Sequence, residues 1–180
     1  MNNKILLCLL ILGASVHAVF AQKNISLEDI WLNYSYYSRS VPGFNFMNDG
    51  ESYSRLQLNK VQKYSIKDGQ FIEDLFALEM LAEGVVAPTS ISGYSFSADE
   101  QKILVESNPE SIYRYSYKAD YFVWSNGALE PLFDGKVMHA SFDPSGSKVA
   151  FVYDNNLYIK NLENGVVDQV TTDGKFNEVI

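Results

Sequence analysis

The sequence has few of the residues on which redox, thiol and metal chemistry depend. It contains one cysteine and two histidines in 180 residues. The cysteine, Cys8, lies in an apolar stretch near the N-terminus, so the rest of the chain has no disulfide, no thiol nucleophile and no thiolate metal site. The acids are scattered and no glycine-rich phosphate loop follows a predicted strand, so we expect no metal and no cofactor.

Positive charge is also scarce. Lysine and arginine number 14 against 22 aspartates and glutamates, which gives a net charge of −8 at pH 7. With no basic cluster, this balance argues against binding to nucleic acid or to anionic membrane surfaces. The hydrophobic fraction of 47% and charged fraction of 20% are those of a globular protein of one ordinary domain. Aromatic residues at 14% favour strands over helices.

The N-terminus has the pattern of an export signal. One positive charge in residues 1–4 precedes an apolar run over residues 5–13, and residues 19–21 (VFA) form a small-x-small cleavage pattern. The apolar run is far shorter than the ~20 residues of a membrane-spanning helix. We expect a signal peptide over residues 1–21 and a mature chain over residues 22–180 in the periplasm, at the cell surface or outside the cell. The alternative, a buried helix, lacks amphipathic spacing.

One short helix is expected near the start of the mature chain. Ser26 has the character of a helix N-cap, followed by Glu28 and Asp29 in the first turn. Ile30 and Trp31 then begin an apolar helical spacing that ends before residues 42–43 (PG). Beyond this point the pattern changes to short β runs separated by turn residues.

A phenylalanine followed by a turn cluster occurs three times, at Phe46, Phe96 and Phe142, with separations of 50 and 46 residues. Each cluster precedes a strand, a second strand, a tight turn with Asn-Gly or Asp-Gly, and a further strand. The expected strands after the three clusters cover residues 53–58, 60–66 and 71–76, then 103–106, 120–124 and 128–133, then 148–153, 157–161 and 166–170.

Four short strands in each repeat of ~40–50 residues are typical of a β-propeller blade. Middle strands such as residues 149–153 are apolar on both faces, as a blade between two neighbours requires. We therefore expect an all-β fold with about three four-stranded antiparallel blades in an incomplete ring, and an ordinary β-sandwich is the alternative. Known propellers have ~4–8 blades, so one blade face and one sheet edge would stay uncovered, and the chain would be the front part of something longer.

From residue 26 to residue 180 the sequence resembles the N-terminal β-propeller of dipeptidyl peptidase IV, in the prolyl oligopeptidase family of serine peptidases. The most specific stretch has the pattern R-x-S-Y-x-A-x-Y, in register with its blade. The segments that carry the resemblance are residues 27–30 (LEDI), 94–99 (YSFSAD), 103–108 (ILVESN), 112–121 (IYRYSYKADY), 156–160 (NLYIK) and 171–174 (TTDG).

The resemblance implies a function for one residue. In that family an eight-bladed propeller caps an α/β-hydrolase domain, whose serine nucleophile removes dipeptides with proline or alanine second. Arg114 matches the propeller arginine that reaches into the shared cavity and holds a substrate carbonyl; the alternative is a solvated loop arginine. The aromatic ladder Tyr113, Tyr115, Tyr117 and Tyr121 is expected to pack within its blade. The family's glutamate pair has no matching motif here, and Glu178 takes no role from it.

The catalytic parts of such an enzyme are not expected in this chain. A Ser-His-Asp site needs a histidine, and beyond the leader only His139 is a candidate; its place at the start of a strand favours a structural role. The nearest string to the nucleophile elbow G-x-S-x-G is residues 93–97 (GYSFS), which begins a blade.

Three hypotheses follow. The chain is the substrate-gating and substrate-binding propeller of an exported dipeptidyl peptidase IV-like exopeptidase, inactive alone; or a stand-alone exported binding module; or a non-functional remnant of a truncated gene. The first implies as partners peptides with Pro or Ala second, the remaining blades, an α/β-hydrolase domain and, in the full-length parent, a homodimer.

Overall fold

The computed structural model describes residues 24–38 and 43–176, in two compact units that divide between Val41 and Pro42. The first unit contains helix α2 (Leu27–Trp31). The hydroxyl of Ser26 accepts a hydrogen bond from the backbone N–H of Asp29 at 3.0 Å, which confirms the predicted N-cap. The helix is shorter than predicted, because it ends at Trp31 and Tyr34 has a positive φ of 47°. The predicted signal peptide lies outside the described residues.

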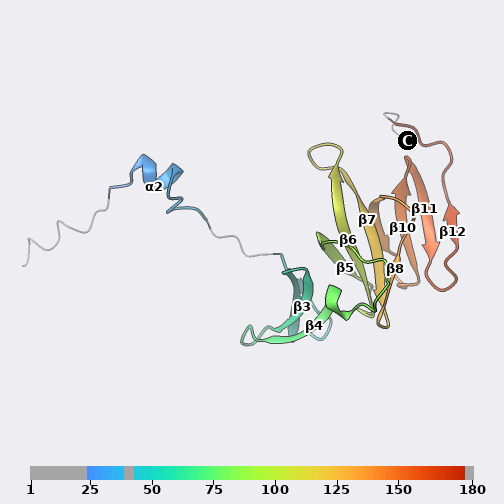
Figure 1. The fold of residues 1–180 in the computed structure, drawn as a ribbon, viewed down its shortest axis with the longest axis horizontal. Helices are drawn as coiled ribbons and strands as arrows, with labels where there is room; N and C mark the ends of the chain where they lie inside the picture. The colour runs from blue at the N-terminus through green and yellow to red at the C-terminus, as the bar shows by residue number, and fades with distance from the viewer. Residues whose placement is uncertain (1–23, 39–42, 177–180) are drawn as a thin grey trace, which may run out of the picture. The chain divides into compact units, whose positions relative to one another are not determined.

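The second unit consists of three four-stranded antiparallel sheets, each a simple meander in chain order (Figure 1). We call them blades 1, 2 and 3. A short 3₁₀ turn, η2 (Leu78–Met80), follows blade 1. Blade 1 contains β1 (Asn45–Phe46), β2 (Ser52–Gln57), β3 (Lys60–Ser65) and β4 (Phe71–Ala77). Blade 2 contains β5 (Gly93–Phe96), β6 (Lys102–Ser111), β7 (Tyr117–Ser125) and β8 (Ala128–Pro131). Blade 3 contains β9 (Met138–Phe142), β10 (Lys148–Tyr153), β11 (Asn156–Asn161) and β12 (Val167–Gln169).

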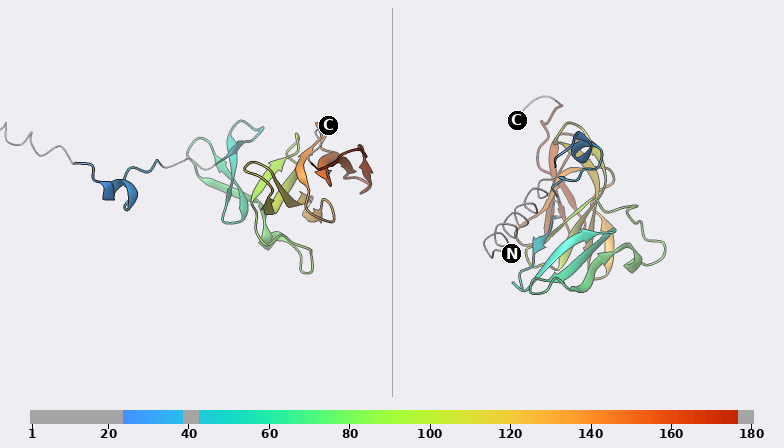
Figure 2. Two further views of the ribbon diagram at one scale, coloured as in Figure 1. Left: turned by 90° about the horizontal axis from the view of Figure 1, so that it is seen from above. Right: turned by 90° about the vertical axis from the view of Figure 1, so that its left-hand side faces the viewer.

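This architecture confirms the all-β class and the repeat of four strands. In the described part of the chain the strands form separate consecutive sheets and no closed barrel. The three blades follow one another in chain order, as the second view also shows (Figure 2). None of the described helices has the length and apolar character needed to cross a membrane.

The turn that opens each blade is held by an aspartate, and we call Asp49, Asp99 and Asp143 the opening aspartates. Each carboxylate accepts a hydrogen bond from the backbone N–H two residues further on, at 2.9, 3.1 and 3.4 Å, and one from a nearby serine hydroxyl. These bonds lower the pKa of each opening aspartate below its ordinary value, and the hydrogen bond from the serine hydroxyl has the largest effect. The local turn chemistry therefore explains why the motif recurs.

The hydrophobic core lies between the blades. Blade 2 buries both faces, because Ile103 and Val105 face a cluster shared with blade 1 while Leu104 faces a cluster shared with blade 3. Blade 1 contributes Val61 and Phe76 to the first cluster. The opening turns also meet, since Asn48 donates from its side chain to the carbonyl of Ala98 at 2.8 Å and from its backbone to Glu100 at 2.7 Å.

Candidate functional site

Blade 2 carries a hairpin that extends beyond its own sheet. β6 and β7 have 10 and 9 residues, whereas β5 pairs only with residues 103–106 and β8 only with residues 122–125. Among the described residues, therefore, no strand lies beside the far end of the hairpin, apart from a single bridge between Ala119 and Val137 at its base. The loop at this end is visible above β6 and β7 in Figure 1.

Arg114 lies at the tip of this hairpin. The turn is closed by the carbonyl of Ser116, which accepts from the N–H groups of Ile112 at 2.8 Å and Tyr113 at 3.1 Å. Arg114 is exposed, and its guanidinium carbon lies 5.5 Å from the centre of the Tyr115 ring. None of the ion pairs between described residues includes Arg114. Its guanidinium donors therefore point to no carboxylate of this part of the chain.

The tyrosines of this segment divide into two groups. Tyr121 is 9% exposed and belongs to the core between blades 2 and 3, as predicted. The prediction is wrong for Tyr113 and Tyr115, which are 60% and 86% exposed, and for Tyr117, which is also exposed. The physical reason is the length of the hairpin, because no neighbouring blade reaches the rings near its tip.

Glu106 connects the hairpin to the blade. One of its carboxylate oxygens accepts from the hydroxyls of Tyr117 and Tyr121, both at 2.8 Å, and the other accepts from Ser92 at 2.9 Å. The hydrogen bond to Glu106 raises the pKa of Tyr117. The pKa of Tyr121 is also raised, mainly by burial and to a lesser extent by the hydrogen bond to the same carboxylate. Tyr117 is three residues from Arg114, so this network fixes the strand that carries the arginine.

A second set of polar contacts fixes the other strand of the hairpin at Asn108, which has a positive φ of 49° where the β6–β7 register shifts. Its side chain accepts from Thr89 at 3.0 Å and donates to Asp120 at 3.1 Å, and its carbonyl accepts from Lys136 at 2.7 Å. Lys136 also pairs with Glu110 at 3.6 Å. The hairpin is therefore anchored on both strands.

Beside this network is a cavity of about 260 Å³ whose lining includes Glu106, Tyr117, Tyr121 and His139. His139 is exposed and has a φ of 54°, at a register irregularity between β9 and β10. Its place at the start of a strand would let it alternate into the blade, but the irregularity leaves it exposed instead. Among the described residues no serine or carboxylate is hydrogen-bonded to His139, so the structure assembles no triad around it.

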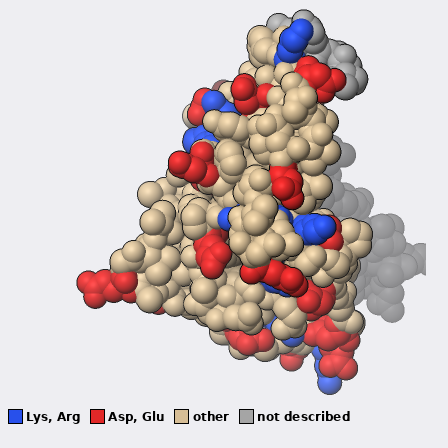
Figure 3. Space-filling model, turned by 90° about the vertical axis from the view of Figure 1, so that its right-hand side faces the viewer, with Lys and Arg blue, Asp and Glu red and all other residues tan. Residues whose placement is uncertain are grey.

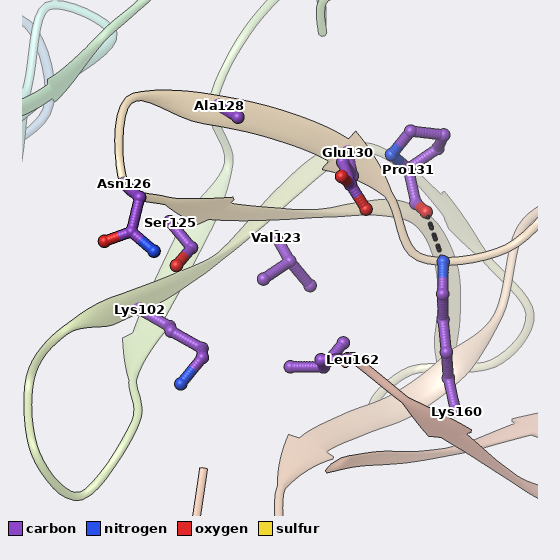
Figure 4. Close-up of a pocket in the computed structure, with 9 residues that line it drawn as sticks. All are labelled: Lys102, Val123, Ser125, Asn126, Ala128, Glu130, Pro131, Lys160 and Leu162. Atoms are coloured by element: carbon purple, nitrogen blue, oxygen red, sulfur yellow. Dashed lines mark hydrogen bonds between the residues drawn. The ribbon is translucent and has the colours of Figure 1, made fainter. Parts of the chain in front are cut away.

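A second cavity of about 290 Å³ lies between blades 2 and 3 at the end opposite the hairpin (Figure 4). Lys160 donates from its ammonium group to the carbonyl of Pro131 at 2.9 Å. Burial lowers the pKa of Lys160, and the nearby charge of Glu130 opposes that shift. The amine of Lys160 in this cavity is therefore used in a structural hydrogen bond to Pro131, and the lining residues form no nucleophile–base pair.

The other predicted motifs have structural roles. Residues 93–96 form β5, and Ser97 is buried with its hydroxyl donated to Asp99, so the GYSFS string begins a blade as predicted. No group of three or more potential metal ligands occurs among the described residues.

The fold and the hairpin define a class: a row of β-propeller blades with an exposed arginine and, in the described residues, no catalytic triad. Residues 97–180 match the family model described as the dipeptidyl peptidase IV (DPP IV) N-terminal region. The crystal structure of Porphyromonas gingivalis dipeptidyl peptidase 4 superposes with a TM-score of 0.73 and 34% identity, over 87% of this chain and 23% of that one. These findings confirm the resemblance to the N-terminal propeller portion of dipeptidyl peptidase IV.

Two curated relatives also match this chain. The chain is 26% identical to prolyl endopeptidase FAP of Homo sapiens over 97% of its own length, and 37% identical to a probable dipeptidyl-aminopeptidase B of Sclerotinia sclerotiorum over 43%. The aligned parts are 23% and 9% of those relatives. The chain thus spans less than a quarter of the length of the curated relatives it matches.

The sequence analysis singled out Arg114 through the resemblance alone and did not identify the residues that anchor its hairpin. Glu106 and Asn108 both lie in β6, whereas Lys136 comes from the segment before β9, and their contacts form only in the folded blade. One signal was available: Glu106 directly follows the apolar run of residues 103–105, which is the buried part of β6. A carboxylate at such a position needs hydrogen-bond donors.

Proposed function

We propose that the chain is the propeller part of an exported serine exopeptidase that releases X-Pro and X-Ala dipeptides from peptide N-termini. In this proposal the blades gate and bind the substrate, and the Ser-Asp-His domain lies outside residues 1–180. The family match, the structural match and the relative named as a probable dipeptidyl-aminopeptidase B support it. The export signal expected in residues 1–21 supports a periplasmic, cell-surface or secreted location.

One observation carries the proposal: Arg114 stands at the tip of an anchored hairpin, exposed and without an ion pair among the described residues. A guanidinium offers several fixed donors to a carbonyl oxygen and keeps its charge at any physiological pH. The arrangement therefore suits a ligand that arrives from outside the sheet.

The test uses a chimera. The matched segment of P. gingivalis dipeptidyl peptidase 4 is replaced by residues 24–176 of this chain, and release of a chromophore from Gly-Pro anilide is measured. A charge-assisted hydrogen bond contributes roughly 1.5–3 kcal/mol, so Arg114→Ala should lower kcat/KM by about 10- to 150-fold. Arg114→Lys should restore part of that loss, because an ammonium cannot reproduce the planar geometry.

Stability is measured in parallel. Arg114→Ala should leave the melting temperature near that of the parent chimera, and Lys67→Ala, at an exposed turn of blade 1, is the matched control for both readouts. If Arg114→Ala lowers the melting temperature while the specific activity of the folded enzyme is unchanged, the arginine supports the blade and binds no substrate. The 180-residue chain alone should release no chromophore. Activity of this chain that survives His139→Ala would contradict the proposal that the catalytic residues lie outside residues 1–180.

A second candidate, a stand-alone exported binding module, is favoured by the exposed aromatic rings beside Arg114. The coding sequence beyond Ile180 discriminates between the candidates. Further blades, a glutamate pair and a distal nucleophile elbow support the exopeptidase. A stop codon in intact flanking sequence supports the binding module or a truncated gene.

A further inference from the structure

The long hairpin of blade 2 contains a β-bulge between its sheet and its tip. Up to Ser107 the residues of β6 pair in regular order with β7, and pairing resumes at Glu110, opposite Lys118. Between these pairs two residues of β6, beginning with Asn108, face the single residue Ala119 of β7. The φ of Asn108 is 49°, in the left-handed region. The bulge therefore separates the part of the hairpin that belongs to the blade from the tip.

The tip beyond the bulge is small. Among the described residues two strand pairs hold it together, Glu110 opposite Lys118 and Ser111 opposite Tyr117. Arg114 lies in the turn that follows these pairs. A β-bulge bends its strand and re-aims the side chains beyond it. The direction in which the Arg114 guanidinium points therefore depends on what holds the bulge in place.

Residues 136 and 137, which lead from blade 2 into blade 3, hold both strands of the hairpin at the bulge. On β7 the backbone of Val137 exchanges two hydrogen bonds with that of Ala119, both at 2.9 Å. On β6 the ammonium group of Lys136 donates to the carbonyl of Asn108 at 2.7 Å and pairs with Glu110 at 3.6 Å. The Lys136 side chain thus connects the first residue of the bulge to the first strand pair beyond it.

The charges around Lys136 are those of individual contacts. The pKa of Glu110 is lowered, mainly by the hydrogen bond from Lys118 and to a lesser extent by Lys136. On the face of the molecule shown in Figure 3, basic side chains are scattered among acidic ones and form no patch of one sign. We therefore attribute the effect of Lys136 to its contacts with Asn108 and Glu110.

We propose that Lys136 is a positioning residue for substrate binding by Arg114, because it fixes the bulge that sets the direction of the hairpin tip. This inference rests on the proposed function, since it needs Arg114 to contact the substrate. A misplacement of about 1 Å at a binding group can cost about 100-fold in rate. A loosened bulge should therefore weaken substrate binding although Arg114 itself is intact. All the contacts that carry the inference lie within residues 107–137.

The test uses the chimera with P. gingivalis dipeptidyl peptidase 4 and Gly-Pro anilide. Lys136→Met should raise KM about tenfold and leave kcat within about twofold, because the affected contact binds substrate and takes no part in the bond cleavage. Lys136→Arg should restore most of the loss, since a guanidinium also donates to the carbonyl of Asn108 and the carboxylate of Glu110.

Lys60→Met in blade 1 is the matched control. The side chains of Lys60 and Lys136 are equally exposed, at 30%, and Lys60 also lies near two acids, Asp74 at 3.5 Å and Glu79 at 3.6 Å. This substitution should leave KM unchanged. The melting temperature of each variant is measured in parallel, and the two lysine variants should differ little in it.

A double-mutant cycle shows whether Lys136 acts through Arg114. In an Arg114→Ala chimera, Lys136→Met should change KM by less than about twofold, because no guanidinium remains to be positioned. The same rise in KM in both backgrounds overturns the inference, and so does a Lys136→Met variant with an unchanged KM. In either case a large effect of Arg114→Ala leaves the proposed function standing. An Arg114→Ala chimera with unchanged kcat/KM overturns both.

Hydrogen exchange of the 180-residue chain tests the clamp without any enzyme assay. The amides of Ile112 and Tyr113 donate to the carbonyl of Ser116 in the tip. In Lys136→Met they should exchange at least about fivefold faster, while the amides of residues 103–105 in the same strand stay unchanged. Lys60→Met should leave both groups unchanged. Equal rates at the tip in wild type and Lys136→Met, or the same acceleration along the whole of β6, overturn the inference.

Discussion

Replacement of Glu106 by alanine tests whether the carboxylate holds the Arg114 hairpin in place. The carboxylate accepts hydrogen bonds from Ser92, Tyr117 and Tyr121 at 2.8 to 2.9 Å. A hydrogen bond to a charged group contributes about 1.5–3 kcal/mol, and leaving a buried hydroxyl without a partner costs about 1–3 kcal/mol. Three bonds that share one acceptor are not additive. We therefore expect a loss of roughly 2–4 kcal/mol out of the ~5–15 kcal/mol typical of a domain.

Thermal and urea unfolding followed by circular dichroism measure this loss, which should lower the melting temperature by roughly 5–15 °C. Glu106→Gln keeps one acceptor oxygen and should cost about half as much. Tyr117→Phe removes a single bond at an exposed ring and should cost about 1 kcal/mol or less. Hydrogen exchange of the hairpin amides should accelerate in the alanine variant before global unfolding. A Glu106→Ala protein as stable as the parent, with unchanged exchange, would refute the anchoring role.

The same network predicts an alkaline limit of stability. The pKa values of Tyr117 and Tyr121 are raised above the ordinary value of 10.0 in the folded chain. A raised pKa means that the stabilisation is fully present below pH 10 and is lost as the pH rises above it, because the unfolded state releases these protons first. Glu106→Ala should flatten the melting-temperature profile above pH 10, and an unchanged alkaline slope would contradict the assigned cause.

Two further predictions concern the blade openings. The opening aspartates have lowered pKa values, so their stabilisation is present above the ordinary value of 3.8 and is lost as the pH falls below it; a melting temperature that is flat through this range would contradict that role. Gly146→Ala should cost more than Gly50→Ala in urea unfolding. Both glycines have a φ near 70°, where alanine costs about 1–2 kcal/mol, but only at Gly146 does the added Cβ lie 3.0 Å from Ser97. Equal losses of stability in the two variants would show that the close approach of Gly146 to Ser97 contributes nothing to the cost of the substitution.

The blade pattern could be predicted because its determinants are local. An aspartate that accepts the N–H two residues further on acts within one turn, and the Asn126-Gly127 dipeptide sets a tight hairpin from two residues with positive φ. Residues 148–153 were predicted as a strand and form β10 with those bounds. Strand ends were less accurate where pairing extends a strand, as in β6, which was predicted over residues 103–106 and runs to Ser111.

By itself the sequence determined the four-stranded repeat and the N-cap at Ser26. Each of these depends on neighbours along the chain or on alternation within one strand. Only the tertiary structure decided which sheet face meets which, and with it the partners of Glu106, the outward turn of His139 and the shielded Nε of Arg55. Those properties depend on contacts between residues that lie tens of positions apart in the sequence. The alternation of residues along a strand does not reveal which face of that strand is covered.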